Sequence, residues 1–221
     1  MSQIHHITNL DVLKEAMNEP EMKVRLKAIG AISSYKPEIA FPILEPLLED
    51  SDPEISRTTT MRLLKRKNEL AYEKALKLLE DGIDDEKENI ALTIASNGYD
   101  YGVDYIMDKI KNPKNAWMLT YLQKNESQKA TMAFVEGLHS PFLFVRARST
   151  YALGARRSKM AIPHLIETMK DEYPNVRRMA AQALFKITGV ILPPESEKWR
   201  QWWDENKSKY ENPEEAPSKV Q

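Results

Sequence analysis

The sequence predicts an all-α solenoid in which about six helix pairs stack in order and one further helix closes the C-terminal end. The first observation is helical periodicity, since the segment 171–189 places apolar residues at steps of four, four and three. These residues are Val176, Ala180, Leu184 and Ile187. The second is recurrence, because Val24 and Ile55, and again Val145 and Val176, are 31 residues apart. The third is composition: 13 prolines and only 7 glycines suit helices joined by short turns.

The apolar columns of the first helices define the repeats. The six expected repeats occupy residues 9–35, 40–67, 69–98, 101–124, 128–157 and 160–189. One column of the first helix reads Leu13, Leu44, Ala75, Ile106, Phe134 and Leu165. A second column, four residues later, reads Met17, Leu48, Leu79, Ile110, Leu138 and Met169. Eleven of these twelve residues are large and apolar, so we expect a continuous apolar stripe along the stack.

In four of the repeats the second helix carries a small residue in the middle of its apolar face, which allows neighbouring helices to approach closely, whereas the third repeat has Ile90 there. Examples are Ala28, Thr59, Ser149 and Ala180. In the fourth repeat the register has two solutions, with either Met118 and Leu122 or Trp117 and Tyr121 facing the core. We favour Met118 and Leu122, because they lie 31 residues before Ser149 and Leu153. This choice leaves Trp117 and Tyr121 nearer the surface.

The two ends of the chain differ from the repeats. Residues 1–8 are expected to be a lead segment before a solenoid that covers residues 9–189. The segment 190–210 is expected to form a capping helix, on which three tryptophans share one face at i, i+3 and i+4. They are Trp199, Trp202 and Trp203. Residues 211–221, which contain little besides Glu, Asn, Pro, Ser and Lys, are expected to be a disordered tail.

The best-preserved second helix identifies a family. Pro-Asn-Val-Arg-Arg-Met-Ala-Ala-Gln-Ala-Leu-Phe-Lys-Ile-Thr-Gly, residues 174–189, resembles the second helix of HEAT repeats, in particular the short HEAT-like type first associated with phycobilisome lyases. The resemblance covers residues 9–189. It implies a right-handed superhelix of antiparallel helix pairs whose second helices line a concave surface. The resemblance is specific for the fold and says almost nothing about function.

The same resemblance implies a ladder of ion pairs, with an acidic residue at the turn between the helices and a basic residue six positions later. Three pairs fit this pattern: Glu19 with Arg25, Asp81 with Lys87, and Asp171 with Arg177. The second repeat departs from it, with Asp50 followed by Ser56. In the fifth repeat Ser140 occupies the acidic position opposite Arg146. We therefore expect Arg146 to lack a local partner and to be free to bind a ligand.

Basic residues gather near the C-terminal end of the repeats, although the whole chain has a net charge of −1. Residues 141–191 contain 9 basic and 3 acidic side chains. The candidate partner-binding residues in this block are Arg146, Arg148, Arg178 and Lys186, and they suggest a surface for an acidic segment or for phosphates. Trp117 and Tyr121 are a second candidate, because aromatic residues in an irregular repeat can anchor a partner. A solvated basic face and simple repacking of a degenerate repeat are the alternatives.

Chemistry-bearing motifs are missing from the sequence. With 0 cysteines the chain has no thiolate ligand or cysteine nucleophile, and neither a glycine-rich phosphate loop nor a Gly-x-Ser-x-Gly elbow occurs. His5 and His6 lie at the terminus, and His139 and His164 are interpreted as isolated. We therefore expect no catalytic residue, no metal and no cofactor. The N-terminus lacks the pattern of a signal peptide, and no apolar run is long enough for a membrane span.

The function that these features favour is a non-catalytic, monomeric, cytoplasmic scaffold that binds another protein on the concave face of the solenoid. A nucleic-acid-binding protein, including one related to HEAT-like DNA glycosylases, is an alternative that would use the basic block. A bilin lyase-type enzyme subunit is a second alternative, which only the repeat subtype suggests.

Overall fold

A computed structural model describes residues 2–81 and 84–211, with side chains described for residues 9–80 and 87–210. Throughout the described residues the chain is helical and contains no strand. Helices pack against their neighbours in sequence, which confirms the predicted all-α, α-α solenoid class. The chain divides into two compact units, an N-terminal unit of residues 1–102 and a C-terminal unit of residues 103–221.

The N-terminal unit contains the first three helix pairs. They are α1 (Ser2–Ala16) with α2 (Met22–Ile32), α3 (Pro37–Leu44) and η1 (Glu45–Glu49) with α4 (Pro53–Leu64), and α5 (Glu69–Asp81) with α6 (Asp84–Ser96). Helix α1 begins at Ser2, so the segment expected to be a lead is helical where it is described. The division between the units falls within α7 (Asp100–Lys109).

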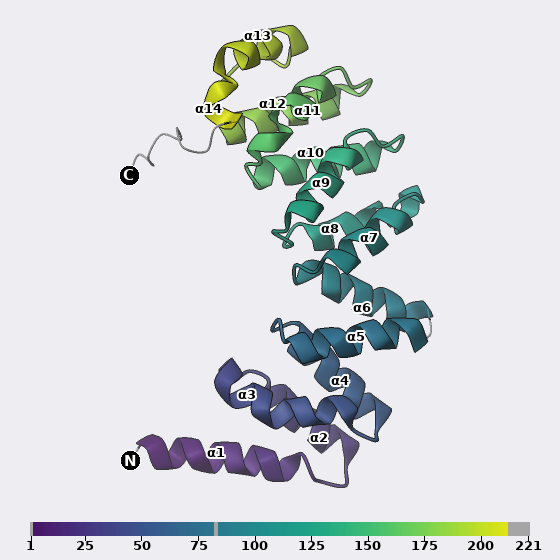
Figure 1. The fold of residues 1–221 in the computed structure, drawn as a ribbon, viewed down its shortest axis with the longest axis vertical. Helices are drawn as coiled ribbons and strands as arrows, with labels where there is room; N and C mark the ends of the chain where they lie inside the picture. Colours follow the sequence, from purple (N-terminus) through teal and green to yellow (C-terminus); the bar gives the residue numbers. More distant parts are fainter. Residues whose placement is uncertain (1, 82–83, 212–221) are drawn as a thin grey trace. The chain divides into compact units, whose positions relative to one another are not determined.

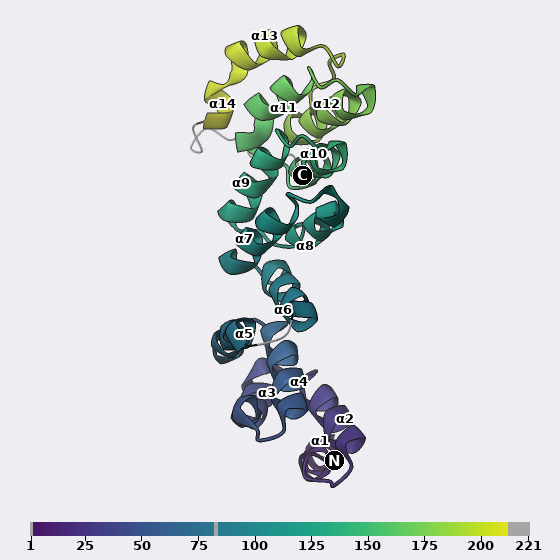
Figure 2. The same cartoon turned by 90° about the vertical axis from the view of Figure 1, so that its right-hand side faces the viewer.

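The C-terminal unit continues from α7 and forms two layers of helices (Figures 1 and 2). One layer contains α7, α9 (Gln128–Gly137) and α11 (Ile162–Thr168), the last preceded by η3 (Lys159–Ala161). The other contains η2 (Pro113–Met118) with α8 (Leu119–Leu122), then α10 (Leu143–Ala155) and α12 (Pro174–Thr188). Helices α13 (Ser196–Asn206) and α14 (Ser208–Glu211) follow the last pair, and the predicted tail, residues 212–221, lies outside the described residues.

Capping residues explain where several of these helices begin and end. The Asp52 carboxylate accepts a hydrogen bond from the Glu54 N–H at 3.0 Å, and Pro53 follows in the first turn of α4. Ser127 caps α9 in the same way, through the Ala130 N–H at 3.1 Å. Helix α12 ends at Gly189, whose φ of 75° is a left-handed conformation that favours glycine.

The predicted apolar columns form the core. Leu44, Ile106, Phe134 and Leu165 are fully buried. In the fourth repeat Met118 and Leu122 are buried, whereas Trp117 is 40% exposed and Tyr121 is 37% exposed, so the favoured register is confirmed. The first repeat is less well packed, since Leu13, Met17 and Val24 are only half-buried.

Two arginines link second helices of consecutive repeats at their C-terminal ends. Arg66 donates a hydrogen bond to the Ser33 carbonyl of α2. Arg156 donates to the Leu122 carbonyl, which ends α8, at 2.5 Å. Lys67 and Arg157, the residues that follow, both have left-handed φ angles, 58° and 50°. Both arginines thus donate to carbonyl groups at the C-terminal end of the preceding second helix.

The C-terminal helices close the stack around the tryptophans. Trp199 is fully buried and lies edge-to-face with Trp202 at 5.5 Å between ring centroids. Tyr210 of α14 packs on Trp202 at 5.7 Å. Helix α13 contacts α11, and Arg200 pairs with Glu167 of α11 at 2.5 Å. This arrangement agrees with the predicted Trp-rich capping helix.

Candidate functional site

The exposed side of the second helices in the C-terminal unit combines aromatic and cationic side chains. We call this surface the second-helix face. It comprises Trp117, Tyr121, Phe144, Arg148, Tyr151, Arg178, Phe185 and Lys186. Helix α10 contacts η2, α8 and α12, so the three second helices are adjacent in chain order. The face is therefore a continuous layer presented by three consecutive repeats.

The aromatic members are unusually exposed for their size. Phe144 is 68% exposed and Tyr151 is 52% exposed, although both lie on a helix whose other side is fully buried. Trp117 and Tyr121 lie edge-to-face, with ring centroids 6.0 Å apart. Large exposed aromatic rings of this kind are enriched where proteins bind partners.

Two of the cationic members each make one contact with a neighbouring side chain. The Lys186 ammonium lies over the Tyr151 ring, 5.2 Å from its centroid, and so joins α12 to α10. Arg178 donates to the Asn175 side chain at 3.0 Å and remains exposed. Arg148 is half-buried. These three charges lie among the aromatic rings of the face, where an acidic group of a ligand could reach them.

Arg146 does not belong to the face, and the expectation that it is free to bind a ligand is wrong. Its guanidinium donates to both carboxylate oxygens of Asp171, at 2.6 and 3.2 Å, and its side chain is only 10% exposed. It also donates to the Ser140 and Pro141 carbonyls at 3.0 and 3.2 Å. The expectation considered only an acid within the same repeat, whereas Asp171 comes from the turn of the next one.

The implied ladder is therefore connected differently from the expectation. Arg25 pairs with Asp52 of the following repeat at 3.3 Å rather than with Glu19. Arg177 donates to the backbone carbonyl of Asp171 at 2.7 Å, while the Asp171 carboxylate serves Arg146.

The third expected pair is only partly described. Lys87 donates to the Glu80 carbonyl at 3.3 Å, and the side chain of Asp81 lies outside the described residues. Lys87, Arg146 and Arg177 thus donate to carbonyls of their own turn. At two rungs the basic residue, Arg25 or Arg146, binds the acid of the next repeat.

The Arg146–Asp171 pair shifts the pKa of both groups. Burial raises the pKa of Asp171, but hydrogen bonds from Arg146 and from the Tyr173 N–H outweigh it and bring the pKa below its usual value. The hydrogen bond with Asp171 raises the pKa of Arg146. Both groups are therefore charged at neutral pH, which makes the pair a structural link between the fifth and sixth repeats.

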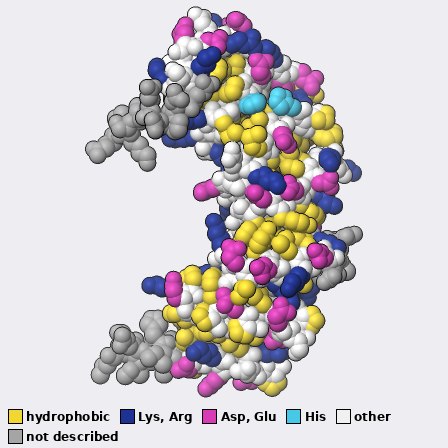
Figure 3. Space-filling model, viewed as in Figure 1, with side chains coloured by type: hydrophobic (Ala, Val, Ile, Leu, Met, Phe, Trp, Pro, Cys, Tyr) yellow, Lys and Arg dark blue, Asp and Glu magenta, His cyan; other side chains and the backbone are white. Residues whose placement is uncertain are grey.

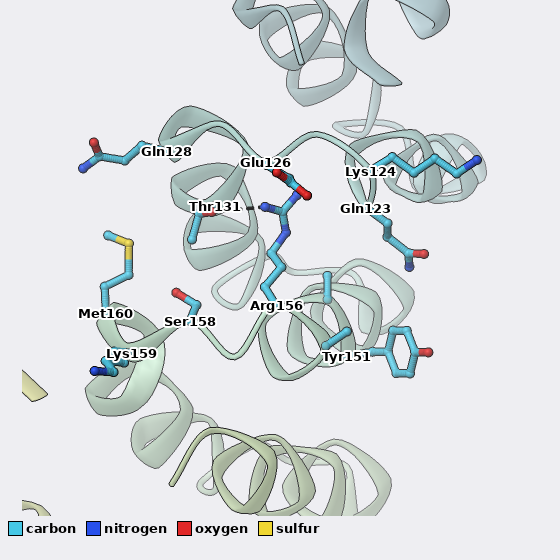
Figure 4. Close-up of a pocket in the computed structure, with 12 residues that line it drawn as sticks. Gln123, Lys124, Glu126, Gln128, Thr131, Tyr151, Arg156, Ser158, Lys159 and Met160 are labelled. Atoms are coloured by element: carbon cyan, nitrogen blue, oxygen red, sulfur yellow. Dashed lines mark hydrogen bonds between the residues drawn. The ribbon is translucent and has the colours of Figure 1, made fainter. Parts of the chain in front are cut away.

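A cavity of about 850 Å³ opens beside the second-helix face and shares Tyr151 with it (Figure 4). The loop after α8, helix α9, the end of α10 and η3 enclose it. Its lining includes three cations, Lys124, Arg156 and Lys159, and one acid, Glu126. The charged side chains of the lining could bind an anionic or amide-bearing group.

Arg156 points into the middle of this cavity (Figure 4). It donates to the Thr131 hydroxyl at 3.3 Å and to the Leu122 and Asn125 carbonyls, and it lies over the Phe134 ring at 5.0 Å. Burial lowers the pKa of Arg156, and the charge of Glu126 opposes that effect. Most of its donors are therefore engaged, and its main role is to join the fourth repeat to the fifth.

The two histidines described in the structure are neighbours, which corrects their interpretation as isolated. His139 and His164 lie edge-to-face with ring centroids 6.2 Å apart, and they are visible as a cyan pair in Figure 3. Burial, together with the charge of His139, lowers the pKa of His164. Groups of three or more His, Asp or Glu side chains that could hold a metal ion do not occur among the described residues, and the side chains of His5 and His6 lie outside them.

Sequence reasoning missed part of the face. Phe144 adjoins the core residue Val145 and was not singled out, because an aromatic residue near a core position is usually buried. The useful signal was its position 31 residues before Asn175, a polar residue on the exposed side of α12. Within the described residues, no helix combines the length and the apolar character needed to cross a membrane.

Comparisons with known proteins identify the family of the repeats. Among solved structures, a crystal structure of an engineered protein is 16% identical, with a TM-score of 0.40, and covers 82% of this chain and 97% of that one. Human deoxyhypusine hydroxylase in complex with glycerol is 14% identical, with a TM-score of 0.36, and the match covers 93% of this chain and 92% of that one. No curated protein sequence matches the chain. The family model for HEAT repeats matches residues 10–97 and 116–196, and the chain therefore belongs to the HEAT-repeat family.

Proposed function

We propose that this HEAT-repeat protein is a non-catalytic scaffold that binds a partner protein through the second-helix face. The observation that carries the proposal is the alternation of exposed aromatic rings with cations over α8, α10 and α12. Trp, Tyr and Arg are the residues that most often dominate binding energy at protein interfaces. Helical repeats supply the extended surface that such binding needs.

The chemistry of the face favours a partner segment that offers both apolar and acidic side chains. The rings of Phe144 and Phe185 would be covered by apolar groups, since leaving them exposed to water is unfavourable. Arg148 and Arg178 would pair with carboxylates at the rim and set the orientation of the partner. Arg146 takes no part, because Asp171 occupies its guanidinium.

A quantitative capture experiment tests the proposal. The full chain and two variants serve as baits in a cell extract, and captured proteins are measured by mass spectrometry. Trp117→Ala with Arg178→Glu should remove a specific partner, whereas Met132→Ala, an exposed change on the first helix α9, should retain it. A partner that binds all three baits equally would show that the second-helix face is not the binding surface.

Nucleic-acid binding is the second candidate, and one observation favours it. Cations interleaved with exposed aromatic rings also suit single-stranded nucleic acid, whose bases stack on such rings. In that case affinity for a labelled oligonucleotide should fall steeply with salt, and Arg148→Glu with Arg178→Glu should abolish it. Binding that survives both changes would exclude this candidate.

A further inference from the structure

A groove on the second helices of the N-terminal unit is rich in cations. It has a volume of about 600 Å³ and lies between the end of α2, the length of α4 and the beginning of α6. Four of its lining residues are cationic: Arg57, Arg62, Lys65 and Arg66. The remaining residues are neutral, and they include Ser33, Ser34, Thr58 and Asn89. Among the side chains that the structure describes, the lining contains no acid.

The two outermost cations of the groove are unpaired. Among the residues that the structure describes, neither Arg62 nor Lys65 forms a hydrogen bond or an ion pair, and both are exposed. Some other cations of the same unit have acidic partners, as Lys74 does in Glu49 at 2.8 Å. The chain carries 33 acidic residues and has a net charge of −1, so the convergence of four cations on one groove is a local feature that its composition does not explain.

The backbone of α2 leaves room for one of these cations. A Cβ placed on Gly30 would lie 3.1 Å from a terminal guanidinium nitrogen of Arg62 and 3.2 Å from its central carbon. The guanidinium thus lies against the bare backbone of α2, with its other side toward the groove. Arg62 and Lys65 are three residues apart on one face of α4, so their charges follow each other by about 5 Å along the helix axis.

The groove differs from a phosphate-binding site. It lies at the C-terminal end of α2, where helix carbonyls are exposed, and Arg66 already donates to the Ser33 carbonyl there. Sites for a single phosphate usually add backbone N–H donors from a helix N-terminus. None of the ten lining residues is aromatic, so bases have no ring on which to stack. Charges arranged along a helix instead match carboxylates spaced along an extended peptide.

We propose that this groove binds an acidic segment of a partner protein, with Arg62 and Lys65 pairing with successive carboxylates. Ser34 and Thr58 border the same groove and can bind the main chain of the segment, while Met61 contacts its aliphatic parts. The site lies in the N-terminal unit and shares no residue with the second-helix face. A test of this groove is therefore independent of a test of the function proposed for the second-helix face.

Fluorescence anisotropy with a labelled glutamate-rich peptide tests the proposal on the full chain. The peptide should bind the wild-type protein, a glutamine peptide of equal length should not, and the affinity should fall as salt is added. Arg62→Glu with Lys65→Glu should weaken binding by roughly tenfold or more, since two attractive pairs become repulsive. Lys36→Glu, a charge reversal at one exposed site outside the groove, should retain the affinity.

Three results would overturn the proposal. The first is peptide binding that survives Arg62→Glu with Lys65→Glu in a protein whose circular dichroism is unchanged. The second is an equal loss in Lys36→Glu, which would reveal a general charge effect. The third is an oligonucleotide that binds more tightly than the peptide and is lost in the same double variant, which would assign the groove to nucleic acid.

Discussion

Removing the Arg146 side chain should destabilise the C-terminal unit strongly. Arg146→Ala deletes the bidentate pair with Asp171 and the donors to the Ser140 and Pro141 carbonyls. The Asp171 side chain is only 6% exposed, so water cannot replace the lost guanidinium easily. What remains for the carboxylate is the Tyr173 N–H at 2.9 Å.

The expected cost follows from this burial. Breaking a buried ion pair by removing one partner typically costs about 3–5 kcal/mol, and the retained Tyr173 N–H places this case near the lower end, at about 3 kcal/mol. Glu172 adds little, because its side chain is 71% exposed. Arg146→Lys should fall between wild type and Arg146→Ala, since an ammonium cannot reproduce the two-pronged contact.

Urea unfolding followed by tryptophan fluorescence reports on the stability of the C-terminal unit, which contains Arg146. All 4 tryptophans, at positions 117, 199, 202 and 203, belong to the C-terminal unit, as does Arg146. Arg178→Ala is the matched control, and it should change the free energy of unfolding by less than about 0.5 kcal/mol because Arg178 is exposed. A loss below about 1 kcal/mol for Arg146→Ala would refute the assignment of a buried structural pair.

The pH dependence gives a second check with a defined sign. The pKa of Asp171 is below its usual value in the folded wild type, so its stabilising contribution is present at neutral pH and is lost as pH falls through that lowered pKa. Without Arg146, burial raises the pKa of Asp171 instead, and protonation then relieves the unpaired charge. The deficit of Arg146→Ala should therefore shrink on acidification, and a deficit that grows would contradict this account.

Three further perturbations test other contacts. Trp199→Ala should lower the free energy of unfolding by about 3–5 kcal/mol in thermal melts followed by circular dichroism, since Trp199 is the fully buried residue of the capping helix α13. Gly154→Ala should cost about 1–3 kcal/mol in urea unfolding, because the added Cβ would lie 2.8 Å from the Cα of Ala183 and force α10 from α12; an unchanged midpoint would contradict the close packing. The pKa of His164 is lower in the folded protein than in the unfolded chain, so below pH 6.5 the unfolded chain binds a proton at His164 more readily. Protonation of His164 should therefore leave Tm unchanged above pH 6.5 and lower Tm as pH falls toward the folded-state pKa. His164→Gln should flatten that dependence, and identical Tm–pH curves for wild type and His164→Gln would rule out this titration.

The helix pairs were predictable because the first helix of each repeat places apolar residues at two positions four residues apart. Leu44 and Leu48, for instance, are one turn apart and recur in every first helix, and burial of such apolar residues is the main driving force of folding. The register of the fourth repeat followed from the same period, since Met118 could be aligned with Ser149.

Contacts between repeats were harder to predict, because they depend on how the layers stack. Stacking brings together residues 25 apart, as in Lys74 with Glu49, Lys129 with Asp104, and Arg146 with Asp171. His139 and His164 have this separation too. A search for complementary residues at this separation would have identified the partner of Arg146, whereas the local spacing of six residues could not.

The groove of the N-terminal unit could not be predicted from charge counts. Its cations lie within a region whose acidic residues outnumber them. One of those acids, Glu49, pairs with Lys74 outside the groove. Only the side-chain positions separate the unpaired Arg62 and Lys65 from the paired cations.

The pairing of Arg146 with the turn of the following repeat also bears on cooperativity. A stack of repeats unfolds as one body only while each interface is more stable than the repeats it joins. The Arg146–Asp171 pair links α10 to the turn between α11 and α12. The pair of Arg200 with Glu167 in turn links the capping helix α13 to α11. Without the Arg146–Asp171 pair, hydrogen exchange should show the last helix pair and the cap opening as a separate cooperative segment, while α9 and α10 stay protected. The position of one guanidinium would then decide where the end of the solenoid begins to unravel.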